Sequence, residues 1–215
     1  MATRSTQSLW EFAAERRAIN ASTRSTICGF DVRFWKIDSS VQPLLEERIA
    51  DALAILRKLD ERRVVRMRSD VRHILVKPVR GSYFWFLTGT IALDQAPILK
   101  RSAAMTAVTL VHEATHARFV RAGVYPYMST LARVERRCVL EEMHFARLLQ
   151  RAGYGGTDRL LDWLGSLLDA NHATLAALVK RKFDLLKELG APRWYLRVWL
   201  AVKRIRHPRT PMPTI

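Results

Sequence analysis

Residues 109–119 read TLVHEATHARF and contain the pattern His-Glu-x-x-His, formed by His112, Glu113 and His116. No proline or glycine interrupts this stretch, so it is expected to form a helix. Apolar residues would seat one side of that helix in a core: Ala107, Leu110, Val111 and Ala114. Residues four apart project from the same helix face, so the two imidazoles can hold one zinc ion. The alternative is an ordinary helix that carries two histidines on one face.

Glu113 lies about 100° around the expected helix from His112. From there its carboxylate can reach a metal-bound water rather than the metal itself. Zinc lowers the pKa of a water that it binds toward about 7, and Glu113 would take the proton and pass it to a leaving amine. The motif therefore predicts Glu113 as a general base, with His112 and His116 as metal ligands.

A zinc ion held by two histidines needs a third protein ligand, and the helix expected at 129–151 offers two carboxylates. Helical spacing places Glu135 and Glu142 within one otherwise apolar stripe. Carboxylates are almost never buried unless they are paired or bound to metal. Glu141 and His144 fall off the stripe and are expected to face solvent. Cys138, one turn beyond Glu135, is expected to be a buried structural thiol.

The ligand spacing, His112-Glu113-x-x-His116 followed after eighteen residues by Glu135, resembles that of the gluzincin metallopeptidases. The gap is similar to that of their aminopeptidase branch, and thermolysin-like enzymes have nearly the same gap. The resemblance covers about residues 70–150 and implies a minimal bacterial gluzincin domain with a zincin-like fold and zinc as its cofactor. It implies His112, His116 and Glu135 as ligands and Glu113 as the base. The chain departs from the aminopeptidase branch because it lacks the glycine-rich exopeptidase motif.

The choice of Glu135 rather than Glu142 as the third zinc ligand follows from the gluzincin-like spacing and from the distance between the two residues along the helix. The two residues lie about 10.5 Å apart along a helix, so they are not expected to bind one zinc ion together. Glu135 is expected as the ligand. Glu142 is expected to accept an N–H from a ligand histidine or to pair with a buried arginine, and it is the alternative ligand.

Zincins add a tyrosine or histidine that stabilises the oxyanion. Tyr125 and Tyr127 are the first candidates, since both follow Gly123 in a loop close to the motif helix. Three further candidates stay open: Tyr83, Tyr154 and His172.

The remaining patterns predict an α+β fold, with helices and a small sheet preceding the motif helix. Expected helices cover 8–20, 43–62, 102–123, 129–151, 158–189 and 192–206, and strand-like segments cover 29–37, 71–79 and 83–94. Pro78 indicates an edge position or a strand end. We expect a single domain, 1–215, with a metallopeptidase core at 39–151, a helical C-terminal subdomain at 157–206 and an irregular tail at 207–215.

The net charge is +16, from 36 basic and 20 acidic residues. Such a charge favours acidic partners, yet no helix-turn-helix, RNP or zinc-finger pattern predicts nucleic-acid binding. Two cysteines give no disulfide framework, which predicts a reducing compartment, the cytoplasm. The helix expected at 192–206 is basic and amphipathic. Its apolar face either packs on the domain core or makes a peripheral membrane contact.

These patterns together predict a zinc-dependent hydrolase, a metallopeptidase that acts on a peptide or protein through a zinc-activated water. The alternative is a non-catalytic zinc-binding protein whose basic surface binds nucleic acid, an anionic membrane or a protein partner.

Overall fold

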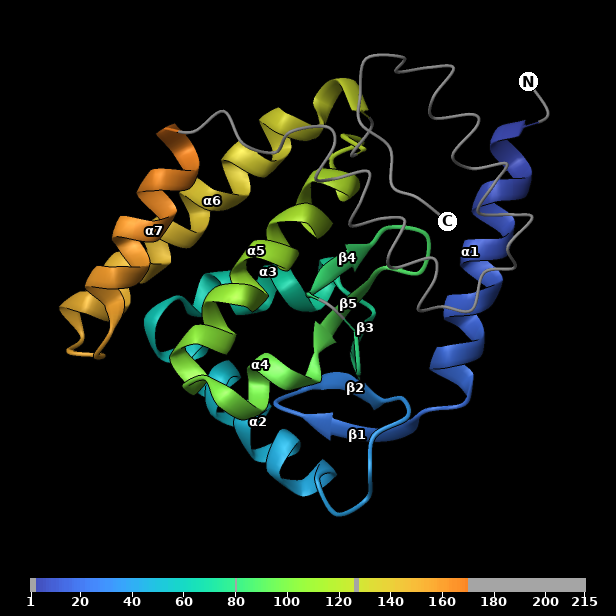
Figure 1. The fold of residues 1–215 in the computed structure, drawn as a ribbon, viewed down its shortest axis with the longest axis horizontal. Coiled ribbons are helices and arrows are strands. Elements are labelled where there is room, and N and C mark those ends of the chain that lie inside the picture. Colours follow the sequence, from blue (N-terminus) through green and yellow to red (C-terminus); the bar gives the residue numbers. More distant parts are fainter. Residues whose placement is uncertain (1–2, 80, 126–127, 170–215) are drawn as a thin grey trace. The chain divides into compact units, whose positions relative to one another are not determined.

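The computed structural model describes residues 3–79, 81–125 and 128–169. Within these ranges seven helices and one five-stranded mixed sheet form an α+β fold (Figure 1). The chain divides into two compact units, residues 21–171 and a second that combines 1–20 with 172–215. Of the second unit the structure describes only α1 (Thr3–Asn20). The metallopeptidase core expected at 39–151 lies inside the first unit.

The first unit contains the five strands and the other six helices that the structure describes. The strands are β1 (Thr23–Ile27), β2 (Phe30–Phe34), β3 (His73–Lys77), β4 (Tyr83–Trp85) and β5 (Thr90–Asp94). The helices are α2 (Gln42–Leu59), α3 (Glu61–Asp70), α4 (Gln95–Lys100), α5 (Ala103–Arg121), α6 (Met128–Arg151) and α7 (Thr157–Asp169).

The strand order in the sheet is β1-β2-β3-β5-β4. The three inner strands, β2, β3 and β5, run parallel, whereas β1 and β4 pair antiparallel at the two edges. Every residue of β5 is buried, as is typical of an inner strand that is covered on both faces. One face carries two rows in register: Val32, Ile74 and Ile91, then Phe34, Val76 and Leu93.

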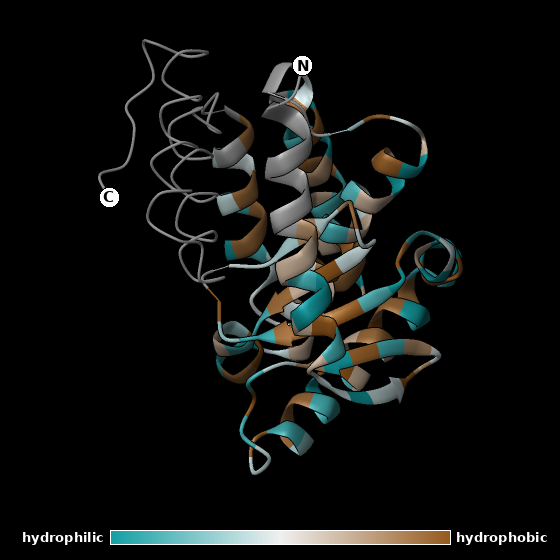
Figure 2. Cartoon of the chain, turned by 90° about the vertical axis from the view of Figure 1, so that its right-hand side faces the viewer, coloured by the Kyte–Doolittle hydropathy of each residue, from teal (hydrophilic) through white to brown (hydrophobic). Residues whose placement is uncertain are grey.

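These two rows join the hydrophobic core together with residues of α2 and α5. The larger core residues of α2 recur every three or four positions, which is typical of an amphipathic helix: Leu45, Ile49, Leu53 and Leu56. Hydrophobic and hydrophilic residues are interspersed along the helices and strands (Figure 2). The buried helix stripes and the sheet face together hold α5 against the sheet.

Two expected segments are each divided in the structure, so these predictions were wrong in detail. The helix expected at 43–62 ends at Leu59, where Asp60 leaves helical geometry and caps α3 by accepting from the Arg63 N–H. The segment expected at 83–94 is a hairpin, β4 and β5, whose turn includes Gly89 at φ +68°. Pro78 follows the end of β3, one of the two positions expected for it.

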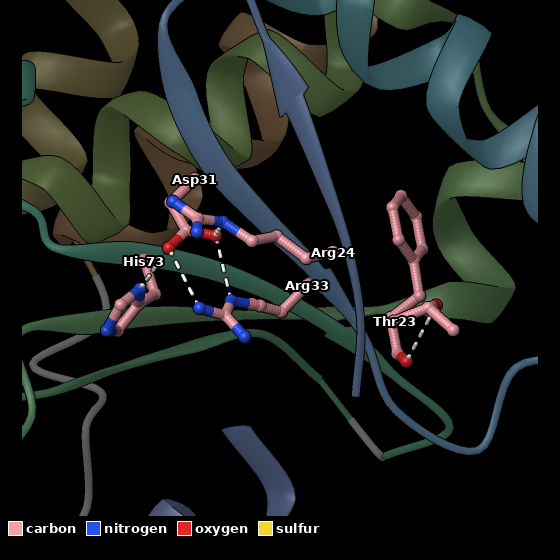
Figure 3. Close-up of polar contacts among 6 residues, drawn as sticks. Thr23, Arg24, Asp31, Arg33 and His73 are labelled. Atoms are coloured by element: carbon pink, nitrogen blue, oxygen red, sulfur yellow. Dashed lines mark hydrogen bonds and ion pairs between the residues drawn. The ribbon is translucent and has the colours of Figure 1, made fainter. Parts of the chain in front are cut away.

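Strand β1 was not expected, because most of its side chains are exposed or half-buried and show no apolar alternation. Polar contacts tie it to its neighbours instead (Figure 3). The Asp31 carboxylate accepts from Arg33 at 2.8 Å, pairs with Arg24 at 3.3 Å and lies 3.2 Å from His73 Nδ1. Burial raises the pKa of Asp31, but the two guanidiniums and His73 outweigh it and lower that pKa overall.

Several expectations fall outside the described residues, namely Tyr127, His172, the basic helix at 192–206 and the tail at 207–215. Of the subdomain expected at 157–206, the structure describes α7. No helix among the described residues has both the length and the apolar character needed to cross a bilayer.

Candidate metal centre

Helices α5 and α6 bring the candidate ligands together. Ser102 caps the start of α5 by accepting from the Met105 N–H, and Gly123 at φ +77° turns the chain after its end. The connection to α6 is short, and the two helices pack side by side (Figure 1). His112 contacts both Glu135 and Glu142, while the later residue His116 contacts the earlier Glu135. The helices are therefore antiparallel, as the sequence predicts if a short turn joins them.

Four side-chain atoms converge between the two helices. His112 Nε2 lies 3.2 Å from His116 Nε2 and 3.4 Å from Glu135 Oε2. The other oxygen, Glu135 Oε1, lies 3.5 Å from His116 Nε2. The three side chains are largely shielded from solvent, with exposed fractions of 17%, 11% and 23% for His112, His116 and Glu135. Their donor atoms are close enough for one small metal ion to contact all three residues.

Glu142 contacts the opposite edge of the His112 ring. Its Oε2 lies 3.1 Å from His112 Nδ1, and the residue is buried. A carboxylate at this position can accept a hydrogen bond from Nδ1–H. This bond favours the tautomer whose Nε2 lone pair is free to bind a metal. Glu142 therefore contacts His112 from the side away from Glu135, and its role in orienting the ring stays a prediction.

The electrostatics of the centre favour a cation. Burial lowers the pKa of His112, but hydrogen bonds to Glu135 and Glu142 and the nearby charge of Glu113 hold that pKa well above its ordinary value. Glu113 itself is buried, with 4% of its surface exposed. Three carboxylates around two imidazoles stabilise positive charge, whether a proton or a metal ion carries it.

Cys138 is a further donor that sequence reasoning placed in the core but not at the site. The thiol is fully buried, and its sulfur together with nitrogens of His112 and His116 forms a group whose atoms lie within 4.8 Å of one another. This group could hold a metal ion. Burial, followed by the charges of Glu135, Glu113 and Glu142, raises the pKa of Cys138 and favours the neutral thiol without a metal. In the sequence, the feature that could have placed Cys138 at the site was its position one helical turn beyond Glu135.

Three further residues that the sequence analysis considered lie outside the group of metal-binding candidates: Tyr125, His144 and Glu141. Tyr125 lies in the connection after α5, is 38% exposed, and its ring meets Phe86 edge to face with centroids 6.0 Å apart. Its role as an oxyanion donor stays a prediction. His144 is exposed, as expected. Glu141 was expected to face solvent, which is wrong: its side chain is only 18% exposed and is paired with Arg63 of α3.

The edge of the sheet lies next to the metal-centre helix. Among the described residues, strand β4 pairs with β5 alone and lies at the edge of the sheet, and it packs against α5 (Figure 1). An edge strand of this kind presents backbone N–H and C=O groups on its outer side, where an extended peptide can pair with them.

The candidate centre thus combines donors from two helices of one compact unit. Comparisons with protein-family models, with curated proteins and with solved structures find no match for this chain.

Proposed function

We propose that the protein is a zinc-dependent hydrolase, in the first place a peptidase, with His112, His116 and Glu135 as zinc ligands. The observation that carries the proposal is the set of three separations, 3.2, 3.4 and 3.5 Å, among their donor atoms. Tetrahedral ligands about 2.0 to 2.2 Å from zinc lie roughly 3.3 to 3.6 Å apart. The two histidine–carboxylate separations fall in this range, each to a different oxygen of Glu135, and the His112–His116 separation lies just below it. Small side-chain adjustments would therefore bring the three residues around a single zinc ion.

The donor set supports the same proposal. Two imidazoles and one carboxylate suit zinc, and three protein ligands leave a fourth position open, as in catalytic sites. When bound, zinc would supply a Lewis acid that polarises a carbonyl and lowers the pKa of water. The gluzincin-like spacing of the motif and the antiparallel edge strand β4 beside α5 are in keeping with a zincin-like fold.

The chain's own residues would divide the remaining work. Glu113, next to His112 and buried, accepts a proton from the attacking water and donates it to the leaving amine. Glu142 holds the His112 ring through Nδ1. The outer edge of β4 pairs with an extended substrate backbone. Such pairing supports a peptide or protein as the substrate class that we propose.

The test is zinc content measured beside hydrolysis of a mixed peptide library. The wild-type chain should bind one zinc ion and cleave peptides, and Glu113→Gln should keep the zinc but lose about 10² to 10⁴-fold in rate. Glu61→Gln is the matched control. Glu61 is exposed on α3, so this substitution removes the same charge at a position away from the centre. Unchanged hydrolysis by Glu113→Gln, or zinc binding without cleavage by the wild type, contradicts the proposal.

Cys138 supports a second candidate, a non-catalytic zinc protein that acts through its basic surface on nucleic acid, membrane or a protein partner. If Cys138 joined His112, His116 and Glu135, four protein ligands would close the site, as in structural zinc centres. Replacing Cys138 or Glu135 by alanine distinguishes the hydrolase proposal from this structural alternative. Under the hydrolase proposal, Cys138→Ala keeps zinc and activity, whereas Glu135→Ala loses the metal. Under the structural alternative, each variant weakens zinc binding strongly and the wild type cleaves nothing.

A further inference from the structure

A cavity of about 240 Å³ lies between α3, α5 and α6. Four arginines and two carboxylates line it: Arg63, Arg66, Arg118, Arg137, Asp70 and Glu141. None of its lining residues belongs to the candidate metal centre, and on α5 Thr115 and Arg118 lie about 80° and 140° around the helix from the midpoint of the face that carries His112 and His116. The cavity is therefore separate from the candidate metal centre, although both use α5 and α6.

The ion pairs leave an excess of positive charge in this cavity. Glu141 is bound by Arg63 and by Arg137, each at 2.9 Å, and Asp70 is paired with Arg121 at 3.3 Å. Four lining arginines against two lining carboxylates leave a charge of +2. Within the part of the chain that the structure describes, neither Arg66 nor Arg118 has an acidic partner that would neutralise it.

One guanidinium of the cavity is held rigidly in place. Arg63 is 8% exposed and is fixed by Asp60 at 2.9 Å as well as by Glu141. Burial raises the pKa of Glu141, but the hydrogen bond and charge of Arg63, together with Arg137, outweigh this and lower it. Glu141 therefore stays charged at neutral pH and keeps Arg63 oriented. A guanidinium that is already oriented loses less conformational freedom when it binds an anion.

We propose that this cavity binds a phosphate group, either inorganic phosphate or the phosphate of a small monoester. Guanidinium groups bind phosphate oxygens through paired, charge-assisted hydrogen bonds, and a dianion matches the +2 excess. The volume lies below the roughly 300 to 1,000 Å³ of drug-sized ligand sites, which favours a small ligand. Met67 and Phe119 also line the cavity and offer apolar contact to the organic part of a monoester.

The test is titration calorimetry of the full chain with inorganic phosphate, at fixed ionic strength in sodium chloride. We expect saturable binding of one phosphate per chain. Arg66→Gln combined with Arg118→Gln should weaken it about ten- to hundredfold or more, because two charge-assisted contacts are lost. Arg62→Gln combined with Arg147→Gln is the matched control. It removes the same charge from exposed positions of α3 and α6 that do not line the cavity, and binding should stay within about twofold of wild type.

Phenyl phosphate forms the second arm of the titration. Tighter binding than inorganic phosphate identifies a monoester as the ligand class, and weaker binding identifies free phosphate. Ala122→Glu places a carboxylate in the cavity without removing any arginine, so it should also abolish binding even if the double variant fails to fold. No saturable binding by the wild type overturns the proposal, as does equal weakening in the cavity and control double variants.

Discussion

Replacing Glu142 tests how the candidate centre is built. In Glu142→Ala, His112 Nδ1 loses the carboxylate that lies 3.1 Å away, while His116 and Glu135 keep their positions 3.5 Å apart. The His112 ring is then free to rotate or to carry its proton on Nε2. Loss of such an orienting partner lowers metal affinity about 10- to 100-fold, or about 1.4 to 2.7 kcal/mol. Glu142→Gln keeps an acceptor oxygen and should lose less.

The assay is competition for zinc against a chromophoric chelator at pH 7 and 25 °C. Glu135→Ala should show a larger loss than Glu142→Ala, because it removes a ligand rather than an orienting group. Glu141→Ala is the control on the same helix: its carboxylate pairs with Arg63 and not with His112, so zinc affinity should change little. If Glu142→Ala lost the metal while Glu135→Ala kept it, the ligand assignment would be refuted.

Three further predictions concern protons and packing. The pKa of His112 is raised above its ordinary 6.5, so a proton competes with the metal for this side chain at neutral pH. Zinc affinity should therefore rise about tenfold per pH unit between pH 6 and 7. Calorimetric titration with zinc at several pH values measures this rise, and an affinity that does not change with pH contradicts it. The pKa of Glu141 is depressed, so its pairing stabilises the fold above its ordinary value near 4.5 and is lost as pH falls through the folded value. Arg63→Gln should cost about 1.5 to 3 kcal/mol in urea unfolding at pH 7 and little at acid pH, whereas an equal cost at both pH values would disprove the linkage. Leu53→Ala should cost about 2 to 5 kcal/mol, since Leu53 is 1% exposed, but the exposed Leu44→Ala should cost under about 1 kcal/mol; similar losses would contradict the packing argument.

Local periodicity made part of this structure predictable. An uninterrupted helix places His112 and His116 on one face, and the same spacing places Glu135 and Glu142 in the buried stripe of α6. The leucine and isoleucine repeat of α2 has the same helical spacing, and its buried members form the core face of that helix. The helical backbone supplies 3.6 residues per turn, so the order of the amino acids alone determines which side chains share a face.

The division of the expected 43–62 helix was less visible, because Asp60 and Glu61 are polar residues that also occur within helices. The capping role of Asp60 depends on one hydrogen bond to the Arg63 N–H, at 3.0 Å. Strand β1 also has no apolar alternation, and its place depends on Arg24 and its partners on β2. Such elements are fixed by particular polar contacts rather than by a repeating pattern.

Contacts between distant segments were decided only by the tertiary structure. Arg63 and Glu141 are 78 positions apart, and no helical spacing relates them, yet their pairing shields a carboxylate that was expected to face solvent. The approach of Cys138 to the histidines depends on the rotation of α6 against α5. The sequence determined which faces the helices present. The packing of those faces determined which carboxylate meets which imidazole, because side-chain contacts across helices depend on their relative rotation and axial shift, which a local repeat leaves open.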